Sequence, residues 1–193
     1  MESMEQGRQL YAAKQYAQAA EAFTQVINSC RCGVYLREKP CLCKDLLASM
    51  EKGTLRDELK KSCICSARSG RRCENPNHID AFDSLAATYE KDDRVEHSLN
   101  CAKQMINLSP RNPKGYLRCG KVLRLQGLPN LAHKTYRAGI DIVSKKYPDH
   151  PLLVKLREQE EKLRRLMRAD PLMMPPFELV CLIFKQVDFR TLW

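Results

Sequence analysis

Apolar side chains along this chain repeat a pattern of small and large residues that returns after 34 residues. The clearest copy carries Leu85-Ala86, Tyr89, Ser98, Ala102, Met105 and Pro110. The next copy carries Cys119-Gly120, Leu123, Ala132, Tyr136, Gly139 and Ser144. An earlier copy carries Gly7, Leu10, Tyr16, Ala19, Phe23 and Val26. Each copy predicts two antiparallel helices, because small residues let the helices approach while an aromatic ring fills the groove beside them.

This spacing resembles the tetratricopeptide repeat, and the stretch 115–120 (Gly-Tyr-Leu-Arg-Cys-Gly) matches that repeat well. The resemblance implies an all-α fold, a right-handed solenoid of helical hairpins. Another helix is expected to begin at Pro148–Pro151 and to end at Asp170-Pro171. Its leucines fall on one face, which is typical of a capping helix at the end of a solenoid. These leucines are Leu152, Leu156, Leu163 and Leu166.

The first two copies are out of phase, which indicates an insertion. Gly7 and Ala86 lie 79 residues apart, so one repeat of 34 leaves 45 additional residues between Ser29 and His78. Within the insertion, residues 44–61 are expected to be helical, with a break at Gly53 and a capping box over 54–57. A small hydrophobic patch is expected there, formed by Leu46, Leu47, Met50, Leu55 and Leu59.

Seven of the ten cysteines lie in this insertion. A disulfide framework is not expected in the reducing interior of a cell. The candidate metal ligands are Cys30, Cys32, Cys41, Cys43, Cys63, Cys65, Cys73 and His78. Eight ligands suffice for two tetrahedral zinc sites, so one or two zinc ions are predicted. Free thiols in a loop and a redox role are the alternatives. The remaining cysteines, Cys101, Cys119 and Cys181, are expected to be small core residues.

The net charge of +10 indicates acidic partners, although the basic residues are scattered along the chain. No apolar run has the length of a membrane span, so we expect a soluble protein of the nucleus or cytoplasm. The four histidines are dispersed, and no phosphate-binding loop, metalloprotease motif or nucleophile elbow is present in the sequence. An enzyme is therefore not predicted.

In a tetratricopeptide array, the first helix of each hairpin lines a concave groove. Lys114, Arg118 and Lys121 fall on that face, and Arg8 is expected to add charge across the groove. In chaperone-tail receptors of this family, a lysine and an arginine at the positions of Lys114 and Arg118 belong to a five-residue carboxylate clamp. Met4, Arg8 and Ser84 occupy the other three positions, so the resemblance implies a weaker groove for an acidic peptide.

The segment 170–193 is too apolar for a free tail and too short to form a core alone. Its stretches 176–179, 183–184 and 188–192 resemble the opening half of an F-box, the helical module that binds the Skp adaptor of Skp–cullin–F-box ubiquitin ligases. Pro175 departs from the family, which usually has leucine there. By this resemblance, the residues that contact the adaptor are Pro176, Leu179, Ile183 and Phe184. The half-length match predicts that the chain as it stands binds the adaptor weakly or not at all.

Tetratricopeptide repeats, a cysteine-bearing insertion and an F-box-like segment, in that order, resemble the N-terminal part of fungal F-box proteins, in which leucine-rich repeats often follow. The resemblance implies a substrate-recruiting subunit of a ubiquitin ligase, monomeric outside the complex. A nucleic-acid-binding module that uses the basic insertion is the alternative, and a co-chaperone-type adaptor is a third. The predicted divisions are the first hairpin (1–29), the insertion (30–78), two repeats (79–146), the capping helix (147–169) and the F-box start (170–193).

Overall fold

The computed structural model describes residues 2–37, 44–61, 72–73 and 75–169. All regular structure in these ranges is helical, and no strand occurs among them. The helices are α1 (Glu2–Ala12), α2 (Tyr16–Asn28), α3 (Leu46–Glu51), α4 (Leu55–Lys60), α5 (Pro76–Lys91), α6 (Val95–Leu108), α7 (Pro113–Leu125), α8 (Pro129–Ser144) and α9 (Pro151–Ala169). The predicted all-α fold of tetratricopeptide type is confirmed.

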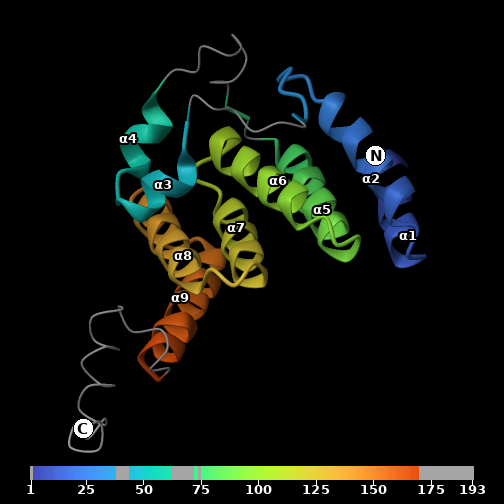
Figure 1. Cartoon of the computed structure of the whole chain (residues 1–193). Coiled ribbons are helices and arrows are strands. Elements are labelled where there is room, and N and C mark those ends of the chain that lie inside the picture. The colour runs from blue at the N-terminus through green and yellow to red at the C-terminus, as the bar shows by residue number, and fades with distance from the viewer. Residues whose placement is uncertain (1, 38–43, 62–71, 74, 170–193) are drawn as a thin grey trace, which may run out of the picture.

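Three helical hairpins stack in chain order, as Figure 1 shows. They are formed by α1 with α2, α5 with α6, and α7 with α8. The second helix of each hairpin packs against the first helix of the next, so α2 contacts α5 and α6 contacts α7. The helix α9 covers α8 at the end of the stack and also contacts α7. Each hairpin therefore buries its apolar face against its neighbour, as solenoid repeats require.

The predicted pairing of small with aromatic residues holds the hairpins together. A Cβ atom placed on Gly120 in α7 would lie 2.2 Å from Cε1 of Tyr136 in α8. Likewise, a Cβ atom on Gly7 in α1 would lie 2.5 Å from Cε1 of Phe23 in α2. Both aromatic rings are buried. Only glycine leaves room for the partner ring at these positions, so the helices approach closely.

The capping helix is present, but its buried face differs slightly from the predicted one. Leu156 and Leu163 are buried as expected, and Leu153 joins them with 1% of its surface exposed. Leu166, in contrast, is 53% exposed, so its assignment to the buried face was wrong. The buried apolar stripe of α9 therefore ends about one turn earlier than the sequence pattern indicates.

The insertion contributes two short helices that lie against the third hairpin. Asp45 caps α3 by accepting a hydrogen bond from the Ala48 amide at 3.0 Å. The predicted break is confirmed at Gly53, whose φ of +73° suits glycine. The predicted capping box is wrong, because Thr54 stands at the N-cap of α4 without a side-chain hydrogen bond. The backbone amides of Asp57 and Glu58 bond to the Thr54 carbonyl instead.

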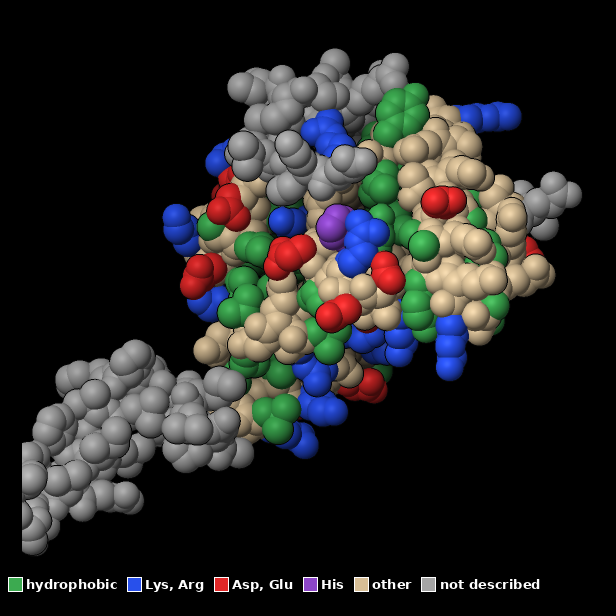
Figure 2. Space-filling model, turned by 45° about the vertical axis from the view of Figure 1, so that its right-hand side comes forward, with side chains coloured by type: hydrophobic (Ala, Val, Ile, Leu, Met, Phe, Trp, Pro, Cys, Tyr) green, Lys and Arg blue, Asp and Glu red, His purple; other side chains and the backbone are tan. Residues whose placement is uncertain are grey.

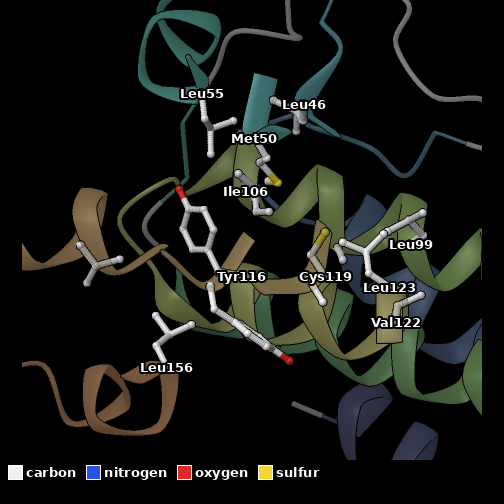
Figure 3. Close-up of a cluster of buried hydrophobic side chains, with 14 of the residues drawn as sticks. Leu46, Met50, Leu55, Leu99, Ile106, Tyr116, Cys119, Val122, Leu123 and Leu156 are labelled. Carbon is white, nitrogen blue, oxygen red and sulfur yellow. The ribbon is translucent and has the colours of Figure 1, made fainter. Parts of the chain in front are cut away.

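Apolar residues of the insertion complete the core of the third hairpin. Leu46, Met50 and Leu55 lie over Ile106 and Tyr116, as Figure 3 shows. Met50 is 3% exposed, and its sulfur accepts a hydrogen bond from the hydroxyl of Thr135 in α8. The predicted hydrophobic patch therefore packs on the repeats rather than forming a separate core. None of the described helices has both the length and the apolar content needed to span a bilayer.

Candidate metal centre and charged groove

The two ends of the insertion meet at one point of the structure. Cys30 and Cys32 directly follow α2, while Cys73 precedes α5 and His78 lies in its first turn. Because α2 packs against α5, the residues that leave one helix lie beside those that enter the other. The backbone amide of Cys73 donates a hydrogen bond of 3.1 Å to the carbonyl of Leu108, which attaches Cys73 to the end of α6.

The side chains of these four residues form a cluster of metal-ligand size. The three sulfurs and an imidazole nitrogen all lie within 4.8 Å of one another. Cys30 Sγ and Cys73 Sγ are 3.8 Å apart, and Cys32 Sγ is 3.4 Å from His78 Nδ1. Tetrahedral zinc with ordinary bond lengths would place two sulfurs about 3.8 Å apart, and a sulfur and a nitrogen about 3.6 Å apart. The cluster therefore fits a Cys3His set around one metal ion.

The ionisation of these groups also suits a metal site. Burial raises the pKa of the Cys30 thiol, but hydrogen bonds from Cys32, Cys73 and Asn75 outweigh burial and hold the pKa below its usual value. Burial raises the pKa of Cys73 to about 12, with the adjacent Cys32 and Cys30 adding to the increase. A cation would offset that cost, because it favours the thiolate. Burial lowers the pKa of His78, which keeps its imidazole neutral and able to bind a metal.

His78 is held firmly in the core. Only 1% of its surface is exposed, and its ring lies 5.2 Å from the ring of Phe82 between their centroids. Its second ring nitrogen, Nε2, is buried and has no hydrogen-bond partner among the described residues. A metal bound at Nδ1 would fix which nitrogen carries the proton, because the proton would then lie on Nε2.

The structure brings together four of the eight predicted ligands. Cys41, Cys43, Cys63 and Cys65 lie outside the described residues, so their role in a second site stays a prediction. The spacing of the thiols alone did not indicate which pairs would meet. The packing of α2 on α5 decides it, because this contact brings the two ends of the insertion together. The other two described thiols, Cys101 and Cys119, are buried in the core as predicted, with 1% and 0% exposed.

The predicted groove residues on α7 face the carboxylates of α5. Lys114 pairs with Asp80. The guanidinium of Arg118 donates from Nε to Asp83 at 2.7 Å and from Nη1 to Glu90 at 2.7 Å. These hydrogen bonds and charges raise the pKa of Arg118 against the opposing effect of burial, so the guanidinium stays charged.

Lys121 completes this network by donating to Glu90 at 2.5 Å. Arg8 does not join it, because Arg8 pairs with Glu5 of its own helix, 3.7 Å away. A hollow of about 540 Å³ adjoins the network, and Lys114, Arg118 and Lys121 are among the residues that line it. An acidic peptide in this groove would compete with acids that the protein already supplies. The 34-residue offset between Lys114 and Asp80, one repeat length, was the signal that could have revealed this pairing from the sequence.

Charges of both signs are interleaved over the surface. Figure 2 shows Lys and Arg side chains beside Asp and Glu across one face, without a continuous basic belt on it. The scattered distribution that the sequence indicates is therefore visible on this face. The predicted adaptor-binding residues, Pro176, Leu179, Ile183 and Phe184, lie outside the described residues.

Three stacked hairpins with a terminal helix define a helical-repeat protein of the tetratricopeptide class. The chain is similar to the F-box/TPR repeat protein pof3 of Schizosaccharomyces pombe, with 34% identity over 122 residues, 61% of this chain and 21% of the relative. It is also similar to Protein DIA2 of Eremothecium gossypii, with 30% identity over 138 residues, 72% of this chain and 18% of that protein. Protein DIA2 of Saccharomyces cerevisiae is 25% identical over 142 residues, 74% of this chain and 17% of that protein.

The resemblance to a fungal protein that combines tetratricopeptide repeats with an F-box is thereby confirmed. The chain spans about a fifth of the length of these curated relatives. No family model matches the chain, and no solved structure matches it.

Proposed function

We propose that this chain is the repeat module of a substrate-recruiting F-box subunit in a Skp–cullin–F-box ubiquitin ligase. The observations that carry the proposal are the similarity to an F-box/TPR repeat protein and the stacked hairpins that the described residues form. Such hairpins bind other proteins through their surfaces and supply no catalytic machinery of their own. The F-box-like segment at 176–192 would bind the Skp adaptor, and the protein would act in the nucleus or cytoplasm as a scaffold rather than an enzyme.

Affinity capture tests this function. A version that continues through a complete F-box should capture the Skp adaptor, and removal of residues 170–193 should abolish capture. Ile183→Asp and Phe184→Asp should each do the same, because an unpaired carboxylate in an apolar contact costs several kcal/mol, about 3 or more. Leu152→Ala on the capping helix is the control and should capture the adaptor normally. Undiminished capture by both aspartate variants would show that the adaptor docks elsewhere.

We further propose that Cys30, Cys32, Cys73 and His78 bind one zinc ion that closes the insertion at its base. The support is the donor set, three thiols and a neutral imidazole, together with distances that match tetrahedral zinc. Zinc with four protein ligands leaves no open coordination position, so its role would be structural rather than catalytic. The ion would hold the end of α2 against the start of α5, and the insertion connects these two points.

The groove on α7 remains the proposed site for an acidic peptide or protein. Its lysines and arginine are already paired with Asp80, Asp83 and Glu90, so the site would favour a ligand that brings several carboxylates over one that brings a single charge. Replacement of Lys114 and Lys121 by alanine should weaken such a partner by roughly 1 kcal/mol, because both ammonium groups stand at the exposed rim. If this double variant binds every captured partner as strongly as the wild type does, the groove is not the binding site.

A further inference from the structure

A hollow separate from the α7 groove lies where the insertion meets the second and third hairpins. It has a volume of about 680 Å³ and is bounded by α4, the turn between α6 and α7, and the end of α8. Its lining residues are Arg56, Leu59, Lys60, Arg72, Leu108, Ser109, Pro110, Arg111, Ile142, Lys145 and Lys146. Six of these are Lys or Arg, and none of the described lining residues is Asp or Glu. We call this hollow the basic pocket.

Half of these cations have acidic partners just outside the pocket. Arg56 and Lys145 share the carboxylate of Asp141, at 3.9 Å and 3.0 Å. Lys60 pairs with Asp57 at 3.0 Å, one helical turn before it. All of these pairs are well exposed, so each is weak and is open to competition from another anion.

The other half have no carboxylate within ion-pair distance in the described part of the chain. These are Arg72, Arg111 and Lys146. Arg72 is held in place by backbone carbonyls: its guanidinium donates to Leu59 at 2.8 Å and to Asn107. This contact ties the end of α4 to the end of α6, so the pocket wall is built by the insertion and the second hairpin together.

The ends of three helices oppose this positive charge without cancelling it. α4, α6 and α8 all present their C-terminal ends to the pocket, and each end carries about half a negative charge. Against six cations stand the two carboxylates of Asp57 and Asp141 and about 1.5 charges from the helix ends. Counted over the described residues, a surplus of about 2.5 positive charges remains. The cations therefore exceed what is needed to complement the helix ends.

We propose that the basic pocket binds a phosphorylated serine or threonine side chain of a partner peptide. A phosphate group carries about 1.5 to 2 negative charges at neutral pH, which matches the surplus better than one carboxylate does. Apolar residues interleave with the cations, namely Leu59, Leu108, Pro110 and Ile142, and they suit the side chains that flank a phosphoserine. No aromatic ring is among the described lining residues on which a nucleic-acid base would stack. This inference does not depend on a role in a ubiquitin ligase.

The experiment measures binding by fluorescence anisotropy with a degenerate nonapeptide library that has phosphoserine fixed at its centre. The same library with serine is the reference, and an oligothymidine of twelve bases is the third probe. Wild-type protein should bind the phosphoserine library at least about tenfold more tightly than the serine library, as expected for one or two charge-assisted hydrogen bonds. Equal binding of the two libraries would overturn the proposal, as would preferential binding of the oligonucleotide.

Matched variants locate the site. Arg111→Glu/Lys146→Glu should lose about tenfold or more in affinity for the phosphoserine library, and the milder Arg111→Gln/Lys146→Gln should lose part of it. Lys91→Glu/Arg157→Glu is the control, because it changes two exposed cations elsewhere and alters the net charge equally. Thermal melts check that each variant folds. Equal losses in the control and in the pocket variants would show a general charge effect and would contradict a site in the basic pocket.

Discussion

The repeats and the insertion are stabilised by different means, although they pack into one structure. In the repeats, side-chain shape sets the fold: Gly120 receives Tyr136, and each hairpin covers the next. In the insertion, two helices of six residues each cannot form a core of their own, so they take their apolar contacts from the third hairpin. The base of the insertion instead brings together a cluster of side chains that could hold a metal ion, Cys30 and Cys73 among them. A periodic sequence therefore specifies packing, whereas the aperiodic insertion specifies local chemistry.

The largest expected effect comes from removal of the metal, which should change the insertion and leave the repeats intact. Chelation, or the substitution Cys73→Ser, should speed proteolytic cleavage within 30–75 by at least about tenfold, because a lost structural metal releases the segment it closes. The far-ultraviolet circular dichroism of the repeats should change little. Cys101→Ala is the control, since this thiol is buried but is not one of the four clustered residues, so its removal should leave metal in place. Unchanged cleavage after complete chelation would mean that packing alone holds the insertion.

A second effect belongs to the repeats alone. Gly120→Ala should lower the free energy of unfolding by about 2–3 kcal/mol, because the new Cβ would overlap the ring of Tyr136. Gly53→Asn in the insertion should cost only a few tenths, about 0.3 kcal/mol, since asparagine tolerates positive φ and no atom lies within 4 Å of the new Cβ. Urea denaturation measures both. A larger loss for Gly53→Asn would reverse the assignment of tight packing to the repeats.

The repeats can be predicted from the sequence to a greater extent than the insertion can. The 34-residue period predicts the three hairpins, and the small residues at Gly7 and Gly120 predict where helices approach. The thiols predict metal chemistry without indicating that Cys30 and Cys32 meet Cys73 and His78, because that depends on a contact between α2 and α5. The 34-residue period can be read directly from the sequence. Which candidate metal ligands meet depends on the packing of helices that are distant in the sequence.

The groove shows a second limit of the sequence. Lys114, Arg118 and Lys121 fall on one helix face, as predicted, but the pattern of cations alone does not reveal their internal partners. The carboxylates that meet them stand one repeat earlier, on α5. The cations that the sequence assigns to ligand binding are thus already engaged in ion pairs within the fold. Arg72, Arg111 and Lys146, which have no carboxylate partner among the described residues, line the basic pocket, and this pocket forms from segments that lie far apart in the sequence.

A third, smaller effect tests the charge network between α5 and α7. Arg118→Ala should lower the free energy of unfolding by about 1–2 kcal/mol, because it leaves Glu90, whose side chain is 7% exposed, with a single exposed lysine partner. Lys114→Ala is the matched control and should cost less than about 1 kcal/mol, since both partners of its ion pair are about one-third exposed. Equal losses measured by thermal denaturation would show that burial of the pair does not matter.

The smallest expected effect concerns thiol reactivity, which should divide the cysteines by region. Burial raises the pKa of Cys101 and of Cys119 to about 12. At pH 8 both thiols therefore stay protonated, and iodoacetamide should not modify them until the repeats unfold. In metal-free protein, Cys30 should react first among the five cysteines that the structure describes, because its pKa lies below the usual value and its side chain is partly exposed. Mass spectrometry of the alkylated peptides reads this order, and early labelling of Cys119 would contradict it.

The most direct test is the zinc content of the purified protein, measured by inductively coupled plasma mass spectrometry after expression in zinc-replete medium. The donor set of Cys30, Cys32, Cys73 and His78 predicts at least about one zinc ion per chain. The double variant Cys30→Ser/Cys73→Ser should lose about one ion per chain relative to the wild type, while Cys101→Ala should keep the full amount. Less than about 0.2 zinc per wild-type chain, in protein that remains helical, would contradict the claim that a metal closes the insertion.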